Sequence, residues 1–171
     1  NHNGQQDPGE PGIVGVTVTL QTITGTLTTV TGPGGLYTFT DQPVNTPLTL
    51  TFSAAAPYTG TLQDLLTDTT DSDANPLTGI VAVVLTTNTN TVDAGFWRPM
   101  MLGNQIWLDV DDDGSLEGGE RGIDGVVVEL YWDTNGSDVF EPGLDARLAT
   151  SVTANGGYYT FSNLIQGDYF V

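Results

Sequence analysis

The chain has 171 residues, of which 21 are acidic and only 3 are basic, giving a formal net charge of −18. Such a negative surface repels nucleic acid and anionic lipid, so neither is expected as a partner. Cysteine is absent, which excludes disulfides and thiol chemistry, and no stretch is long and apolar enough to insert into a membrane.

The first candidate feature in chain order is a polar loop near the N-terminus. Asn1 and Asn3 place amide oxygens at alternate positions, and Glu10 follows as a closing carboxylate. Alternating oxygen ligands closed by a glutamate are typical of calcium loops, although two amides supply less charge than two aspartates would. A weak calcium site and an ordinary polar loop both remain open here.

Short alternating runs follow this loop and predict the fold class. Residues 16–20 (Val-Thr-Val-Thr-Leu) and 48–52 (Leu-Thr-Leu-Thr-Phe) alternate apolar and polar side chains. That period is typical of a half-buried strand. Because such runs are separated by clusters of Gly, Pro, Asn and Asp, the sequence predicts an all-β sandwich.

The most specific motif is the acidic stretch from Asp109 to Glu120, which follows a predicted strand ending at Leu108. Oxygen-bearing side chains fall at loop positions 1, 3 and 5, glycine at 6 and glutamate at 12, as in an EF-hand-type calcium loop. The alternative is an acidic, solvated turn. The predicted metal ligands are Asp109, Asp111, Asp113, the Ser115 carbonyl and Glu120.

A second loop of this kind is expected between Asp133 and Asp145. Oxygen donors again fall at alternate positions, and the closing carboxylate comes one place later than usual. A polar hairpin tip is the alternative. The predicted ligands are Asp133, Asn135, Ser137, Val139 through its carbonyl, and Asp145.

Comparison of the chain with itself reveals a repeat. Residues 3–20 match residues 113–130 at an offset of 110, and residues 34–39 match 156–161 at an offset of 122. The second copy therefore carries 12 additional residues, which fall at the predicted second calcium loop. A repeat of this kind predicts two modules of the same fold.

The repeated motifs resemble the B-repeat module of bacterial serine-aspartate-repeat surface proteins. They include Gly103–Gly114, Gly119–Leu130 and Asn155–Leu164 in the second copy, and Asp71-Ser-Asp73 and Asp93-Ala-Gly-Phe96 in the first. The resemblance implies tandem Ig-like β-sandwiches of the transthyretin-like or Cna-B-like kind that bind calcium. It also implies that Asp71 and Asp73 approach a metal.

On this basis the expected modules are 1–98, lacking its first strand, and 99–171, lacking its C-terminal half. Related pilin-type modules carry isopeptide crosslinks that require lysine. This chain has no lysine, so that crosslink cannot form here.

We expect a structural, calcium-stiffened repeat of a secreted or cell-surface bacterial protein of stalk or adhesin type, and not an enzyme. Neighbouring modules or identical subunits are the expected partners, with host or matrix proteins or glycans as further candidates. One alternative is a filament or sheath subunit that exchanges strands between chains. Another is a carbohydrate- or ligand-binding module that uses Trp97, Trp107 and Trp132, although structural roles are favoured for these rings.

Overall fold

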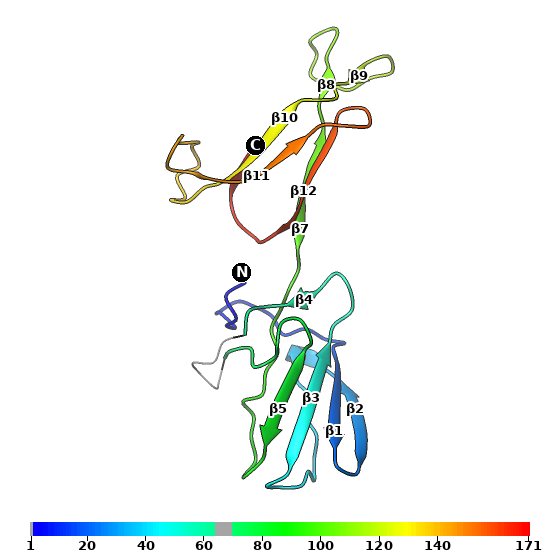
Figure 1. Cartoon of the computed structure of the whole chain (residues 1–171), viewed down its shortest axis with the longest axis vertical. Coiled ribbons are helices and arrows are strands. Elements are labelled where there is room, and N and C mark those ends of the chain that lie inside the picture. Colours follow the sequence, from blue (N-terminus) through cyan, green and yellow to red (C-terminus); the bar gives the residue numbers. More distant parts are fainter. Residues whose placement is uncertain (1, 64–69) are drawn as a thin grey trace. The chain divides into compact units, whose positions relative to one another are not determined.

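The computed structural model describes residues 2–63 and 70–171, in which β-strands joined by long loops are the main regular structure (Figure 1). In this part of the chain the only helical element is a 3-10 turn at Pro33–Gly35, so the predicted all-β fold is confirmed. The chain divides into two compact units, Asn1–Arg98 (unit 1) and Pro99–Val171 (unit 2).

Unit 1 is organised around a four-stranded antiparallel sheet with strand order β2-β1-β3-β5. A short second pair is formed by β4 and β6. The strands are β1 (Thr17–Thr22), β2 (Gly25–Val30), β3 (Pro47–Ser53), β4 (Thr59–Gly60), β5 (Ile80–Val84) and β6 (Phe96–Trp97).

The core of unit 1 follows from the alternation of apolar residues along the central strands. Val18 and Leu20 of β1 and Leu50 and Phe52 of β3 are buried. The alternate residues of β3, Thr49 and Thr51, are only partly buried. Since successive strand residues point to opposite faces, one face of the sheet becomes apolar. Tyr37, from the segment after the 3-10 turn, packs against this face.

Unit 2 has the same central arrangement, with strand order β11-β10-β13, and two separate strand pairs, β12 with β7 and β8 with β9. Its buried core consists of Val128, Leu130 and Phe161. The strands are β7 (Met100–Gln105), β8 (Trp107–Leu108), β9 (Arg121–Gly122), β10 (Val127–Trp132), β11 (Ala146–Val152), β12 (Tyr158–Leu164) and β13 (Tyr169–Phe170).

A buried threonine shows that the sequence repeat is also a structural repeat. In unit 1 the Thr31 hydroxyl donates to the Ile13 carbonyl at 2.6 Å and accepts from the Val16 N–H at 2.9 Å. In unit 2 the Thr153 hydroxyl donates to the Ile123 carbonyl at 2.6 Å and accepts from the Val126 N–H at 2.9 Å. Each hydroxyl therefore satisfies two backbone groups that lead into the central strand.

A pair of glycines recurs in the same way. A Cβ atom on Gly122 would lie 1.7 Å from the Gly156 carbonyl oxygen, and one on Gly12 would lie 2.0 Å from that of Gly34. No side chain fits at either approach, so in each unit the segment that precedes the central strand passes directly over the turn before residue 36 or 158. This contact fixes the position of the segment around Gly12 or Gly122 against that turn.

Candidate metal sites

The acidic loop of unit 2 is fixed at both ends by a short pair of strands. β8 immediately precedes Asp109, and β9 immediately follows Glu120. The two strands pair in antiparallel register, which brings the ends of the loop together. The first and last carboxylates of the motif are therefore positioned by backbone pairing.

Asp109 organises the turn that follows it. Its Oδ1 accepts hydrogen bonds from the N–H groups of Asp112 at 2.7 Å and Asp113 at 3.3 Å, and its Oδ2 accepts from Gly114 at 2.9 Å. These donors, Gly114 above all, hold the pKa of Asp109 below its usual range. Gly114 adopts φ 78°, which explains why the turn requires glycine. The carboxylate is therefore ionised at neutral pH.

Carboxylate oxygens converge in two overlapping groups within this loop. One oxygen each from Asp109, Asp111 and Glu120 lie within 4.8 Å of one another, and so do oxygens from Asp111, Asp113 and Glu117. The structure thus brings three of the predicted ligands together and places Asp113 in the second group. Glu117, which the motif spacing did not single out, joins it there.

The closing glutamate and Ser115 have backbone roles in the same loop. Glu120 accepts from the Val110 N–H at 2.8 Å and from the Glu117 N–H at 3.2 Å. Ser115 donates its N–H to Asp113 at 2.7 Å. The loop is thus preorganised around its carboxylates, which repel one another at these separations. Such an arrangement could bind a metal ion.

In the second loop of unit 2, Asp133 has the same role as Asp109. Its Oδ1 accepts from the N–H groups of Asn135, Gly136 and Ser137 at 3.2, 2.8 and 3.3 Å, and its Oδ2 accepts from Asp138 at 2.9 Å. The Asp138 contact contributes most to lowering the pKa of Asp133. Unlike Asp109, this carboxylate belongs to a buried residue, with 6% of its surface exposed.

The far side of this loop contains a residue that was not among the predicted ligands. Glu141 Oε2 accepts from the Asn135 amide at 2.7 Å and from the Ser137 hydroxyl at 3.2 Å, while its N–H donates to Asp145 at 2.6 Å. The Ser137 hydroxyl also donates to the Val139 carbonyl at 3.1 Å. The sequence could have indicated Glu141, because it occupies the next alternate position after Val139.

Asp133 and Asp145 are both buried acids, each 6% exposed. Among the described residues neither contacts a basic side chain, since Arg147 of the neighbouring strand pairs with Glu129. Backbone N–H groups offset part of the cost of burying these two charges, and a cation would offset more of it.

The N-terminal loop of unit 1 is organised by shorter-range contacts. Asn3 accepts from the Gln5 N–H at 3.0 Å and donates its amide to Asp7 at 3.0 Å. The Asp7 N–H donates to Glu10 at 3.1 Å. Asp7, which was not predicted, therefore lies between two predicted ligands. Asn1 lies outside the described residues.

Asp71 lies beside this loop, although the sequence predicted one site in the loop and a separate site at Asp71 and Asp73. Gln5 and Asp71 form an antiparallel bridge, and the Ser72 N–H donates to the Gly4 carbonyl at 2.8 Å. Asp71 is 5% exposed, and its Oδ1 is buried with no hydrogen-bond partner among the described residues. An unsatisfied buried carboxylate oxygen is rare in folded proteins, and a water molecule or a cation would satisfy it.

Two further carboxylates converge near Asp71. Asp73 accepts from the Asp93 N–H at 2.7 Å, and burial followed by the charges of Asp73 and Asp71 raises the pKa of Asp93 to about 6. The Tyr37 hydroxyl donates to the Val92 carbonyl at 2.7 Å, and the pKa of Tyr37 is raised by burial and then by the charges of Asp93 and Asp73. Without a cation, therefore, this cluster resists full ionisation.

The three tryptophans are half-buried. Trp97 stacks at a tilt on His2, with 4.6 Å between ring centroids, and Trp132 meets Tyr169 edge-on at 5.0 Å. Trp107 has a buried indole nitrogen without a hydrogen-bond partner. Among the described rings, no pair forms a flat, coplanar stacking platform for a sugar.

Comparison with known proteins connects these loops to a family. The model of the SdrD B-like domain matches residues 1–96 and 100–171. Serine-aspartate repeat-containing protein E of Staphylococcus aureus strain USA300 is 37% identical over 175 aligned residues, covering 100% of this chain. A protein of strain MRSA252 named bone sialoprotein-binding protein has the same identity and coverage.

The chain spans only 14% of the length of each of these two relatives. No solved structure matches. None of the described residues forms a helix long and apolar enough to cross a membrane. The relatives are surface proteins of Staphylococcus rather than enzymes, in agreement with the sequence prediction.

Proposed function

Because the chain belongs to the SdrD B-like domain family, we propose that it is a structural repeat stiffened by calcium. The family makes it a cell-surface repeat of an adhesin-type protein, and no catalytic role is required of it. Our proposal concerns what calcium does within the repeat. It also assigns the metal to the loops that the sequence singled out.

The observation that carries the proposal is the convergence of Asp109, Asp111 and Glu120 oxygens within 4.8 Å at the β8–β9 junction. Calcium prefers several hard oxygen ligands at flexible distances. Bound there, it would neutralise mutual repulsion and tie the two strand ends together. The unfolded chain does not hold these three carboxylates in one arrangement, so binding stabilises the folded form by mass action.

Two further sites are proposed on independent grounds. In the Asp133–Asp145 loop, buried carboxylates without counterions favour a cation, with Glu141 joining the predicted ligands. In unit 1 the unsatisfied Asp71 oxygen favours a site built from that residue, the Asn3–Glu10 loop and the Asp73–Asp93 pair. Both proposals rest on burial rather than on spacing alone.

The partners we propose for this chain are neighbouring repeats. The name of one relative states that it binds bone sialoprotein, but this chain covers 14% of that protein's length. A stiff module separates other parts of a surface protein by holding its own shape. Its contribution is therefore mechanical and does not require a ligand-binding face.

Limited proteolysis after chelation tests this proposal. In calcium, we expect the loops 109–120 and 133–145 to resist cleavage by an acid-directed protease. After the metal has been removed and its loss verified by elemental analysis, cleavage should concentrate in those loops. If the verified metal-free protein is cleaved at the same positions and rates as the calcium-loaded protein, the proposal is wrong.

A further inference from the structure

The central sheet of unit 1 ends in an edge strand that carries no charge. In the order β2-β1-β3-β5, strand β5 pairs with β3 on one side and, among the described residues, with no strand on the other. Figure 1 shows β5 at the edge of this sheet. In unit 2, β7 pairs with β12 and takes no part in the sheet that contains β10, so a counterpart of β7 would pair outside this sheet. The free edge of β5 therefore belongs to the sheet itself.

Alternate residues of β5 direct their backbone groups away from β3. The Phe52 N–H donates to the Gly79 carbonyl at 2.9 Å, so these two residues form a hydrogen-bonded pair just before β5 begins. In antiparallel pairing, hydrogen-bonded pairs alternate with pairs that make no hydrogen bonds. The N–H and C=O groups of Ala82 and Val84 therefore point outward. Among the described residues, no backbone hydrogen bond from another segment reaches either residue.

The composition of β5 favours pairing with a further strand. The residues of Ile80–Val84 are all apolar, and all except Ala82 are β-branched. Natural edge strands are commonly protected by charged side chains, proline or a bulge, and β5 has no charge, no proline and no shift in its register. The opposite edge strand, β2, is richer in threonine and begins with glycine. Of the two edges, β5 is therefore the more apolar one.

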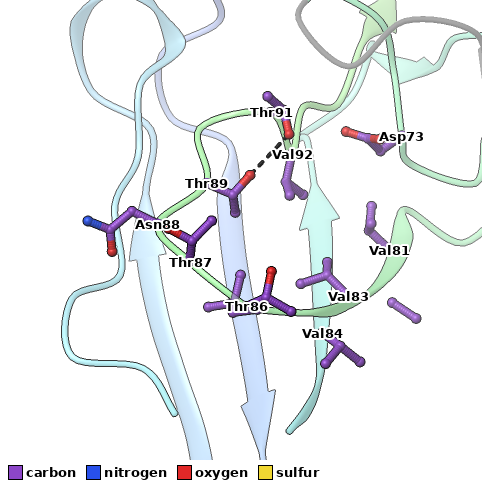
Figure 2. A pocket seen from close by; sticks show the side chains of 12 residues that line it. Asp73, Val81, Val83, Val84, Thr86, Thr87, Asn88, Thr89, Thr91 and Val92 are labelled. Atoms are coloured by element: carbon purple, nitrogen blue, oxygen red, sulfur yellow. Dashed lines mark hydrogen bonds between the residues drawn. The ribbon is translucent and has the colours of Figure 1, made fainter. Parts of the chain in front are cut away.

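The segment that follows β5 leaves this edge open. Leu85 and Val92 pack against the core of unit 1, so segment 85–92 runs over the inner face instead of extending the sheet. Figure 2 shows the segment curving back from β5, with the Thr89 hydroxyl bonded to that of Thr91. Between this segment and β5 lies a hollow of about 330 Å³, and no backbone hydrogen bond crosses it among the described residues.

Charge restricts where two copies of this chain can meet. Each copy has a formal net charge of −18, so most of the surface of one copy repels the other. Strands β1, β2, β3 and β5 contain no charged residue, whereas the corresponding sheet of unit 2 contains Glu129 and Arg147. At the sheet of unit 1 a second copy therefore meets little local repulsion.

We propose that β5 is an interaction surface for β5 of a second copy of this chain, paired antiparallel about a two-fold axis at Ala82. In this register Ile80 lies opposite Val84 of the second copy, and the small Ala82 side chains meet at the axis. Facing apolar pairs stabilise antiparallel strands, and an isologous contact of this kind closes as a dimer. Backbone pairing would join the two sheets into one continuous sheet. The proposal does not depend on calcium.

The strength of this dimer follows from its size and charge. A five-residue edge makes a small interface, so the association is weak and needs high protein concentration. Because both copies are strongly negative, sodium chloride should strengthen the association by screening, whereas it would weaken an interface held by ion pairs. Sedimentation equilibrium of the intact chain, at fixed free calcium and rising protein and salt concentrations, should show a reversible monomer–dimer equilibrium.

Cysteine crosslinking tests the register, because the native chain contains no cysteine. In Ala82→Cys the two thiols meet at the axis, where Cα atoms of a hydrogen-bonded pair lie about 5.5 Å apart, a distance that a disulfide spans. Where the dimer is populated, Ala82→Cys should crosslink at least about tenfold faster than Leu77→Cys, because pairing raises the effective thiol concentration. Leu77 is the matched control, since it is 93% exposed and lies outside the strand. Thr28→Cys reports on the opposite edge, β2.

A matched pair of substitutions tests the axis by charge. Ala82→Glu places two like charges opposite each other, whereas Ala82→Gln adds a side chain of the same size without charge. Ala82 is exposed in the monomer, so both variants should fold, and thermal unfolding checks this. Ala82→Glu should dimerise at least about tenfold more weakly than Ala82→Gln.

Four results would overturn the proposal. The first is a chain that stays monomeric at all protein and salt concentrations. The second is crosslinking of Ala82→Cys no faster than that of Leu77→Cys, and the third is faster crosslinking of Thr28→Cys, which would place the contact on β2. The fourth is equal dimerisation of Ala82→Glu and Ala82→Gln. The crosslinking comparison does not use the charged variant, so a folding defect in Ala82→Glu does not affect it.

Discussion

At the residue scale, the loops are built by single carboxylates that collect backbone N–H groups. Asp109 and Asp133 each accept at least three such bonds, which lowers the pKa of both. Their stabilisation is present above the ordinary aspartate pKa and is lost only when the pH falls through the lower folded-state value. Both carboxylates are therefore charged, and available to a cation, under neutral conditions.

Asp109→Asn tests whether this carboxylate binds calcium. The substitution removes one negative charge and one hard oxygen from the Asp109–Asp111–Glu120 group, so calcium affinity should fall at least about tenfold. Asp112→Asn is the matched control, because it removes the same charge from an exposed side chain of the same loop. Calorimetric titration measures both, and equal affinities in the two variants would contradict the assignment.

Asp93 gives unit 1 an unusual pH dependence when no metal is bound. Its folded-state pKa of about 6 lies above the ordinary value of 3.8, so the folded form retains a proton that the unfolded form has lost. In chelator, the unfolding free energy should therefore fall as pH rises from about 4 to about 6.

Urea unfolding of the native chain and of Asp93→Asn, at several pH values in chelator, measures this effect. The asparagine variant cannot titrate at this position, so the difference between the two proteins isolates Asp93. That difference should change progressively across the same pH interval. A difference that stays constant with pH would contradict the raised pKa of Asp93.

At the element scale, a loop and its sheet are joined by a small number of repeated contacts. The threonine that bonds to two backbone groups and the glycine that passes over a turn occur at equivalent positions in both units. These contacts fix where each central strand begins. They therefore fix the position of the preceding candidate calcium loop.

Thr153→Val should destabilise unit 2 by about 1–3 kcal/mol, because it leaves the Ile123 carbonyl and the Val126 N–H without their partner. Thr150→Val, at an exposed position of β11, the strand that ends just before Thr153, is the matched control and should change stability by less than about 0.5 kcal/mol. Chemical denaturation compares them, and equal losses would show that the buried hydroxyl makes no special contribution.

At the scale of the whole molecule, the sequence predicts most of the architecture because that information is local or repeated. Alternation at residues 16–20 and 48–52 predicts the central strands β1 and β3, which the structure confirms. The repeat predicts that both units share one strand arrangement, and β2-β1-β3 corresponds to β11-β10-β13. The all-β prediction follows from the same patterns.

What the sequence could not predict depends on contacts between distant residues. Asp71 reaches the N-terminal loop through a bridge to Gln5, a separation that no spacing rule encodes. Glu117 joins Asp111 and Asp113 through the backbone conformation of the turn, which composition does not encode.

The whole-molecule consequence of the proposed sites is a repeat whose stability is set by calcium. With 21 acidic residues against 3 basic ones, its carboxylates have few internal counterions. Monovalent salt screens such charges over a distance but does not bridge them. Calcium that coordinates several carboxylates should therefore stabilise the fold far more than salt does.

A calcium titration of the thermal unfolding midpoint, at constant ionic strength, tests the central claim most directly. If calcium binds the folded loops and not the unfolded chain, the midpoint should rise continuously with the logarithm of free calcium above the dissociation constant. Sodium chloride at matched ionic strength should produce only a small shift. A midpoint that responds equally to calcium and to matched sodium chloride would contradict calcium stiffening.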